Sequence, residues 1–330
     1  MYGVYGVKFP VYPELKIPLP SYKEMAKELD DFKPDLIHLA TPIVIGMCGL
    51  KYAKDNGIPF VASYHTNLSQ YLKYYKFKIL ESILWKYFNW IHNQCEANYC
   101  PSKATLQLLR RKGIRNLEIW DRGVDCTEFS PNYRNECLRK KLAGDKKLIL
   151  LYVGRLAHEK NLDVLINTMK RINKQLKDVC LVMTGDGPAR EELQEISPEN
   201  VVFTGYKSGL ELSEIYASAD IFVFPSTTET FGNVVLEAMA SGLPVVAPMA
   251  GGIKDNLING YNGIACKPKN AGDMTRAVVR LAEDRSYRQL LAVQARKYAQ
   301  QKSWKGVFDK LIDSYQRVVY KSCERKSDIV

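Results

Sequence analysis

The stretch Ile221–Pro244, IFVFPSTTETFGNVVLEAMASGLP, joins an apolar run, a polar loop and an apolar helical pattern. A strand that ends at Pro225 and a helix that begins near Gly232 make one βα unit of a parallel sheet. Ligands of open α/β sheets bind at the carboxyl ends of strands, and a helix start offers free N–H groups to a phosphate. The stretch therefore predicts an α/β doubly wound domain with an anion site at this loop.

Strand and helix patterns alternate throughout the second half of the chain. Short β-branched runs separated by amphipathic stretches are typical of a parallel sheet with crossover helices. We predict strands at 148–153, 180–184, 201–204, 221–225, 244–247 and 263–266. Residues 147–302 thus form a complete doubly wound domain. The charged segment 131–146, which has no long apolar run, is predicted to be a linker. The segment 303–330 is predicted to be helical, with apolar residues at Val307, Leu311, Ile312 and Tyr315.

The first half, 1–130, shows the same alternation but a different opening. Strands are predicted at 35–40, 59–64, 97–100 and 117–120, with helices between them. A doubly wound domain usually opens with a strand and a glycine-rich turn. Residues 1–21 are instead rich in proline and aromatics, so we interpret them as a connection within a domain. We expect the first βα units, roughly 60–80 residues, to be absent, leaving an exposed sheet edge and poor solubility.

Composition narrows the classes of partner. The 330 residues carry a net charge of +11, which suggests an anionic partner such as a phosphorylated small molecule or an acidic membrane. No run of five basic residues occurs, which argues against nucleic acid. No apolar run is long enough to span a membrane, and residues 1–20 show no secretory signal. Eight scattered cysteines fit a cytoplasmic protein with free thiols.

Glu229 and Glu237 are the first candidate functional residues. They are eight positions apart, slightly over two helical turns, so on one helix they would lie on the same side. Neither has a basic neighbour in the sequence. The simpler interpretation is that Glu229 caps the helix and Glu237 is a solvated helix residue.

The spacing Glu229–Glu237 resembles the E-x7-E motif of family 4 glycosyltransferases, retaining enzymes built from two facing Rossmann-like domains, the GT-B fold. Four further segments resemble the family in the same order: YHT at 64–66, RGVDCTEFSP at 122–131, GRLAHEKN at 154–161 and GDGP at 185–188. The resemblance covers almost the whole chain. It also implies that the C-terminal helix, 303–330, packs back on the first domain.

The resemblance implies roles for the matching residues. Arg155 and Lys160, after Gly154, would bind the donor diphosphate and stabilise charge that grows as it departs. Glu229 would bind hydroxyls of the transferred sugar and Glu237 those of the ribose. The remaining expected contacts are the backbone N–H groups of Phe231, Gly232 and Asn233, the base-packing Tyr206, and His65, which would orient the sugar.

The implied activity is retaining transfer of a hexose from a UDP- or GDP-linked sugar to a lipid or glycan, without a metal or other cofactor. The segments PDLIHLATP, SYHTNL and GVD-x3-F-x-P resemble the branch with sulfoquinovosyl and mannosyl transferases that make glycolipids. Two alternatives are a nucleotide-sugar epimerase of the same fold, against which the E-x7-E segment argues, and a truncated, inactive nucleotide-sugar-binding remnant.

Residues 71–91, YLKYYKFKILESILWKYFNWI, are a candidate membrane contact. They mix lysines and aromatics and carry apolar residues at helical spacing, namely Leu80, Ile83, Leu84, Tyr87, Phe88 and Ile91. Such a helix suits the surface of an anionic membrane, on its cytoplasmic face. The alternative is an ordinary core-facing helix with a solvated basic face.

Overall fold

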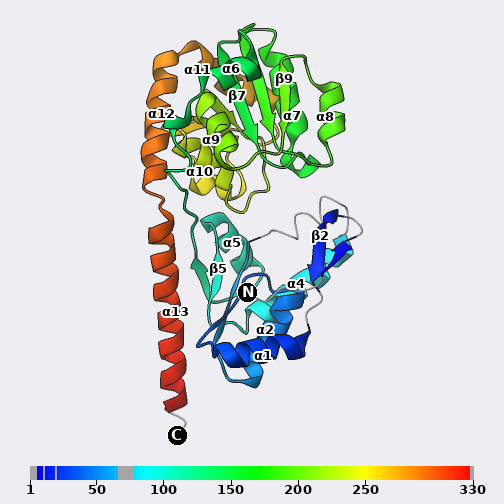
Figure 1. The fold of residues 1–330 in the computed structure, drawn as a ribbon, viewed down its shortest axis with the longest axis vertical. Helices are drawn as coiled ribbons and strands as arrows, with labels where there is room; N and C mark the ends of the chain where they lie inside the picture. Colours follow the sequence, from blue (N-terminus) through cyan, green and yellow to red (C-terminus); the bar gives the residue numbers. More distant parts are fainter. Residues whose placement is uncertain (1–5, 10–11, 19–20, 66–77, 328–330) are drawn as a thin grey trace. The chain divides into compact units, whose positions relative to one another are not determined.

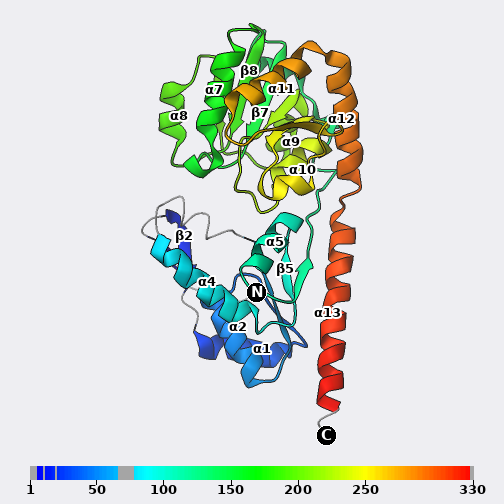
Figure 2. The same ribbon diagram turned by 180° about the vertical axis from the view of Figure 1, so that it is seen from behind.

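The computed structural model describes residues 6–9, 12–18, 21–65 and 78–327. For 6–9, 12–18, 78–80 and 326 it describes the backbone and not the side chains. The chain divides into two compact units (Figure 1 and Figure 2). The first comprises Met1–Asp121 and Phe308–Val330, and the second comprises Arg122–Val307. None of the helices in the described part of the chain is long and apolar enough to cross a bilayer.

The second unit has a six-stranded parallel sheet in the order β12-β11-β10-β7-β8-β9. Its strands are β7 (Leu148–Val153), β8 (Val179–Thr184), β9 (Val201–Gly205), β10 (Ile221–Val223), β11 (Val245–Pro248) and β12 (Gly263–Cys266). The chain therefore builds outward from β7 in one direction and then from β10 in the other. This reversal makes the β7–β10 boundary the switch point of the sheet, and it confirms the predicted doubly wound domain.

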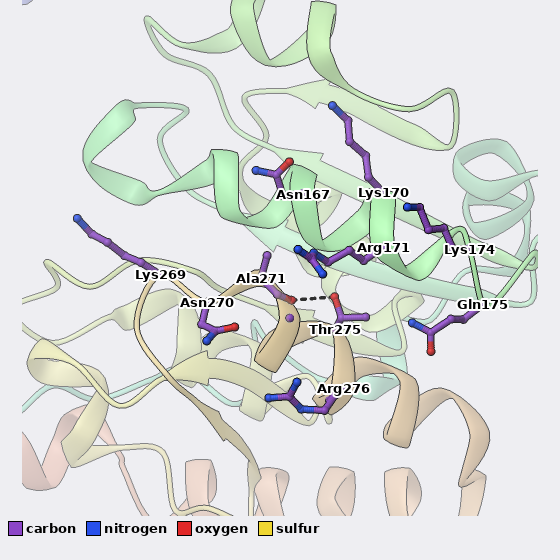
Figure 3. Close-up of a pocket in the computed structure, with 11 residues that line it drawn as sticks. Asn167, Lys170, Arg171, Lys174, Gln175, Lys269, Asn270, Ala271, Thr275 and Arg276 are labelled. Carbon is purple, nitrogen blue, oxygen red and sulfur yellow. Dashed lines mark hydrogen bonds between the residues drawn. The ribbon is translucent and has the colours of Figure 1, made fainter.

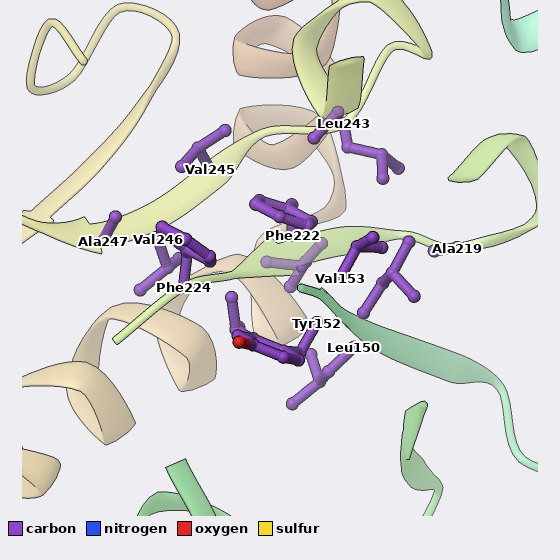
Figure 4. Close-up of a cluster of buried hydrophobic side chains, with 14 of the residues drawn as sticks. Leu150, Tyr152, Val153, Ala219, Phe222, Phe224, Leu243, Val245, Val246 and Ala247 are labelled. Atoms are coloured by element: carbon purple, nitrogen blue, oxygen red, sulfur yellow. The ribbon is translucent and has the colours of Figure 1, made fainter. Parts of the chain in front are cut away.

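Large apolar side chains fill the sheet on both sides of that boundary. Tyr152 of β7 stacks on Phe224, just after β10, with ring centroids 5.8 Å apart, and Phe222 stacks on Phe224 at the same separation. Figure 4 shows these rings on neighbouring strands. All three are essentially buried. Every residue of β7 and β10 is buried, so the central strands are packed on both faces.

Helices surround this sheet. They are η1 (Pro131–Tyr133), α6 (Glu136–Ala143), η2 (His158–Lys160), α7 (Leu162–Ile172), α8 (Arg190–Ile196), α9 (Gly209–Ser218), α10 (Asn233–Ala240), η3 (Gly251–Asp255), α11 (Ala271–Glu283) and α12 (Arg285–Gln300). Asn135, Asn270 and Asp284 cap α6, α11 and α12 through their side chains. α11 packs against α7 and α12.

The predicted linker 131–146 is not a linker in the structure. It contains η1 and α6 and belongs to the second unit. Arg139 of α6 pairs with Asp220 at 2.7 Å, with only 12% and 15% of these side chains exposed. Its guanidinium also donates to the carbonyl oxygens of Ser218 and Lys147. At least one charge of the segment therefore has a structural role, which composition alone does not indicate.

The first unit has a four-stranded parallel sheet in the order β3-β4-β5-β6. Its strands are β3 (Ile37–Leu39), β4 (Phe60–Ser63), β5 (Asn98–Cys100) and β6 (Leu117–Ile119). Its helices are α1 (Tyr22–Phe32), α2 (Val44–Asp55), α4 (Lys78–His92), α5 (Lys103–Arg111) and most of α13 (Trp304–Ser327). The opening residues differ from the predicted connection, because β1 (Gly6–Phe9) and β2 (Tyr12–Pro18) pair as an antiparallel hairpin.

Helix α13 begins in the second unit and from Phe308 onward packs against the sheet of the first. Leu311 and Val318 are buried with β5, and Ser314 hydrogen-bonds with Tyr99 at 2.8 Å and donates to Glu118 at 2.7 Å. Of the apolar residues named in this segment, Ile312 is half exposed. At 100° per residue it lies beside the buried stripe rather than within it.

His38 of β3 connects two other segments of the first unit. Its two ring nitrogens hydrogen-bond with the hydroxyls of Tyr315 in α13 and Ser63 in β4. Burial lowers the pKa of His38 to about 4. Burial also lowers the pKa of His92 in α4, although the hydrogen bond to Asn98 opposes it.

We expect acid to destabilise the protein between pH 6.5 and 4. A histidine with a lowered folded pKa binds fewer protons folded than unfolded, so the free energy of unfolding falls as pH falls through this window. For His38 alone the loss is about 3 kcal/mol. Denaturant unfolding at several pH values would measure it. The His38→Gln variant should lose that part of the pH dependence; an unchanged slope in this variant would contradict the assignment.

Candidate active site

Two loops meet at the switch point of the second unit. One leaves β7 at Val153 and passes through Gly154 and Arg155 into η2. The other leaves β10 at Val223 and reaches α10 at Asn233. Because β7 and β10 are hydrogen-bonded neighbours and run parallel, both loops start from the same edge of the sheet. This is the position where open α/β sheets bind ligands.

Lys160 and Glu229 form an ion pair across these loops. Lys160 Nζ lies 2.6 Å from Glu229 Oε1, and 15% and 16% of the two side chains are exposed. The Ser226 hydroxyl donates to the same carboxylate oxygen at 2.7 Å. Glu229 had no basic neighbour in the sequence because its partner comes 69 residues earlier. The structure thus brings together two of the predicted site residues.

The helix after this loop begins later than the spacing argument required. Glu229 lies in the loop, and α10 begins at Asn233 after Gly232, whose φ of +84° is left-handed. Glu229 and Glu237 are therefore not on one helix, and the N-cap residue of α10 is Gly232 rather than Glu229. Glu237 is not solvated either: it accepts a hydrogen bond from the Tyr216 hydroxyl at 2.9 Å. Burial raises the pKa of Glu237.

Two adjacent glycines, Gly251 and Gly252, pack against the backbone of the Glu229 loop. The Gly252 N–H donates to the Glu229 carbonyl oxygen at 2.8 Å. A Cβ on Gly252 would lie 2.2 Å from the Thr230 carbonyl oxygen, and one on Gly251 would lie 2.5 Å from that of Glu229. Only backbone without side chains fits there. The contact is not visible in the sequence, because Gly251 and Gly252 come more than 20 residues after Glu229.

A second close backbone approach forms the Arg155 turn. Tyr152 donates its hydroxyl hydrogen to the Arg155 carbonyl oxygen at 3.0 Å, and the Leu156 N–H donates to that of Asp186 at 2.9 Å. A Cβ on Gly185 would lie 2.0 Å from the Gly154 carbonyl oxygen. The glycine at 185 in the GDGP segment therefore allows the turn after β8 to lie against the turn after β7.

Glu159 is a buried carboxylate that the sequence did not single out. It is 2% exposed, and its Oε2 has no hydrogen-bond partner among the described residues. Its carbonyl oxygen accepts from the Thr228 hydroxyl at 3.3 Å, which ties η2 to the Glu229 loop. The pKa of Tyr152 is raised by burial and then by the carboxylates of Glu229 and Glu159. Glu159 thus adds an unused acceptor near the Lys160–Glu229 pair.

Both halves of the chain match models of known protein families. Residues 134–301 match the model described as "Glycosyl transferases group 1", and residues 1–128 match "Glycosyltransferase Family 4". The chain is 38% identical over 314 residues to a GDP-mannose-dependent alpha-mannosyltransferase of Mycobacterium tuberculosis, covering 94% of this chain and 80% of the relative.

The chain is a family 4 glycosyltransferase.

Other comparisons agree with this assignment and confirm the resemblance seen in the motifs. The glycosyltransferase is 34% identical over 311 residues to the sulfoquinovosyl transferase SQD2 of Arabidopsis thaliana, covering 92% of this chain and 60% of that protein. The crystal structure of Anabaena HepE in complex with UDP and glucose superposes with a TM-score of 0.77 at 20% identity, covering 89% of this chain and 80% of that one. This likeness confirms the predicted two-domain fold.

The remaining predicted donor-site residues of the glycosyltransferase lie on the same unit. Phe231 is buried, and its carbonyl oxygen accepts from Asn256 at 3.3 Å. Asn233 opens α10 and is exposed. Tyr206 follows β9 and is 75% exposed, so it fills no core space. In the described residues no group of three or more His, Cys, Asp or Glu side chains is placed to hold a metal ion.

His65 belongs to the first unit of the glycosyltransferase, two residues after β4. Its ring lies 5.3 Å from the ring of Trp120, edge to face. With Ser63 and His92 it lines a cavity of about 30 Å³, room for roughly one water. Asn98 donates its amide hydrogens to two carbonyl oxygens, so its Oδ1 accepts from His92 Nδ1. This leaves the buried Nε2 of His92, which has no partner among the described residues, as an acceptor.

Proposed function

We propose that this glycosyltransferase moves a hexose from a UDP- or GDP-linked sugar to a lipid or glycan acceptor, with retention at the anomeric carbon. The observation that carries the proposal is the Lys160–Glu229 pair at the switch point of the second unit. A cation and a carboxylate at this edge match the two ends of a sugar diphosphate, since one binds phosphate and the other binds sugar hydroxyls.

Charge stabilisation is the main contribution of the donor site. Lys160 and Arg155 would bind the diphosphate, and the N–H groups at the start of α10, from Phe231 to Asn233, would add to them. In the structure Lys160 is paired with Glu229. A bound diphosphate would share this cation, while Glu229 keeps the Ser226 hydroxyl. The stabilisation of the diphosphate would then increase in the transition state. The phosphate oxygen gains negative charge there, because it keeps the electron pair of the bond that breaks.

The other predicted residues would fix orientation. Glu229 would accept hydrogen bonds from the sugar and Glu237, held by Tyr216, from the ribose. Tyr206 would stack on the base, and His65 would orient the sugar. In the proposed front-face step the acceptor oxygen bonds to the anomeric carbon as the bond to the phosphate oxygen breaks. The acceptor proton passes to that phosphate oxygen, so neither a metal nor another cofactor is required.

Relatives favour a mannosyl donor and a lipid acceptor. Three relatives of this chain at 34–38% identity are named GDP-mannose-dependent alpha-mannosyltransferases. Another, 30% identical over 244 residues, is the alpha-monoglucosyldiacylglycerol synthase of Streptococcus pneumoniae. We therefore propose GDP-mannose as the first donor to test.

Helix α4 supports a peripheral contact with the cytoplasmic face of an anionic membrane. Ile83 and Trp90 are 59% and 50% exposed, which gives the helix apolar surface outside the core. Ile83 was expected to share the apolar face of the helix, but it is exposed. The core face consists of the predicted Leu84, Tyr87, Phe88 and Ile91, together with Trp85. Residues 71–77 and the side chain of Leu80 lie outside the described residues.

Thermal-shift measurements test the proposed donor. We expect GDP and GDP-mannose to stabilise the protein by about 2.7 kcal/mol at 100 times their dissociation constant, and ADP to have little effect. A shift with UDP and UDP-glucose instead would keep the site and change the base. Failure of all these ligands would contradict the donor site. Incubation of GDP-mannose without an acceptor, followed by analysis of the nucleotide sugar, tests the epimerase alternative.

A further inference from the structure

A basic groove runs between α7 and α11 of the second unit. It contains a hollow of about 840 Å³, within the size range of small-molecule sites. Figure 3 shows Arg171 lying between α7 and the start of α11, with Lys269 at one end of the hollow and Lys174 at the other. A second hollow of about 720 Å³ adjoins it and shares Gln175, Thr275 and Arg276.

The lining of the first hollow has charge of one sign. Five cations line it and no carboxylate does; they are Lys170, Arg171, Lys174, Lys269 and Arg276. Arg276 pairs with Asp273 of its own helix at 2.7 Å. Across the part of the chain that the structure describes, the other four have no ion pair. The donor site differs, because its Lys160 is already paired. Mutual repulsion of cations in one hollow is relieved when an anion binds among them.

The start of α11 adds partial positive charge to the same hollow. Asn270 Oδ1 accepts the Asp273 N–H at 2.9 Å, and the Asn270 carbonyl oxygen accepts that of Met274. The N–H groups of Ala271 and Gly272 come first in the helix, so they have no acceptor within it. Both residues line the hollow. An anion there would receive backbone donors as well as side-chain charges.

We propose that this groove binds a phosphorylated anion with two or more negative charges, at a site separate from the donor site. Guanidinium and ammonium groups around one hollow suit phosphate oxygens, and several cations suit more than one phosphate. The donor-site residues lie in the loops after β7 and β10, whereas the groove residues lie on the outer surfaces of α7 and α11 and in adjoining turns. The phosphates belong either to a free molecule or to lipid headgroups.

Lysine acetylation followed by mass spectrometry would test the groove residue by residue. At low ionic strength, where screening is weak, inorganic tripolyphosphate should slow acetylation of Lys170, Lys174 and Lys269. Lys140 and Lys141, exposed on α6 of the same unit, should react at an unchanged rate. In titrations with tripolyphosphate, the double variant Arg171→Gln/Lys174→Gln should raise the dissociation constant of the groove about tenfold or more. Lys140→Gln/Lys141→Gln makes the same change in net charge and should leave it unaltered.

The outcomes separate the sources of phosphate. Protection by tripolyphosphate supports a free anion. Protection by phosphatidylglycerol vesicles, but by neither tripolyphosphate nor phosphatidylcholine vesicles, supports headgroups. No protection by any probe, or equal protection of Lys140 and Lys141, would overturn the proposal. Tripolyphosphate can also occupy the donor site, but Lys160 reports on that site separately, so failure of the proposed function and failure of the groove are distinguishable.

Discussion

Replacing Lys160 with alanine is expected to lower kcat/KM for sugar transfer by about 100- to 1,000-fold. The substitution removes the ammonium group that lies 2.6 Å from Glu229 at the switch point. In the proposed mechanism this group stabilises the departing diphosphate, so the substitution removes that stabilisation. It also leaves the Glu229 carboxylate, 16% exposed, without its cation. Initial rates over a range of donor concentrations, with GDP-mannose as the first donor, would measure the loss.

A matched substitution and a double-mutant cycle make this result specific. Lys140→Ala removes a lysine from an exposed position of the same unit and should change kcat/KM by less than about twofold. Because Lys160 and Glu229 are in contact, the losses for Lys160→Ala and Glu229→Gln should be clearly non-additive. Near-normal transfer by Lys160→Ala would remove Lys160 from the donor site, and additive losses would mean that the pair does not act as a unit.

Gly252→Ala should destabilise the second unit and weaken nucleotide binding together. The added Cβ would lie 2.2 Å from the Thr230 carbonyl oxygen and 2.6 Å from the Phe231 Cα. Both neighbours are backbone atoms, so the Glu229 loop must move to make room. We expect a loss of about 1–3 kcal/mol in the free energy of unfolding. Displacement of the loop should also reduce the thermal shift by the donor nucleotide.

Gly306→Ala is the control for this substitution. Gly306 is an exposed residue of α13 whose Cβ would meet nothing closer than the Ser303 hydroxyl oxygen at 3.6 Å. Alanine there should leave stability unchanged or raise it by up to about 1 kcal/mol through helix propensity. Nucleotide binding should not change. If Gly252→Ala were as stable and as responsive to nucleotide as Gly306→Ala, the close approach at Gly252 would not constrain the loop.

The sequence by itself determined the strands and the family. All ten predicted parallel strands occur in the structure, from β3 to β12, because apolar runs and helical spacing are local properties of the chain. The motif residues Lys160 and Glu229 were also named from the sequence, since residue type and order are enough for a resemblance. Local signals were weakest where a charge has a structural role. The charges of 131–146 suggested a linker, although Arg139 in this segment binds Asp220.

Only the tertiary structure decided which residues act together. Glu229 pairs with a lysine 69 positions earlier, and Gly252 supports its loop from the turn after β11. The basic groove likewise combines residues near 170 with residues near 270. These contacts depend on the order of strands in the sheet and on the packing of α7 against α11. Periodicity and motif spacing describe neighbours along the chain, whereas the reversal of strand order at β7 and β10 is set by how the whole sheet packs.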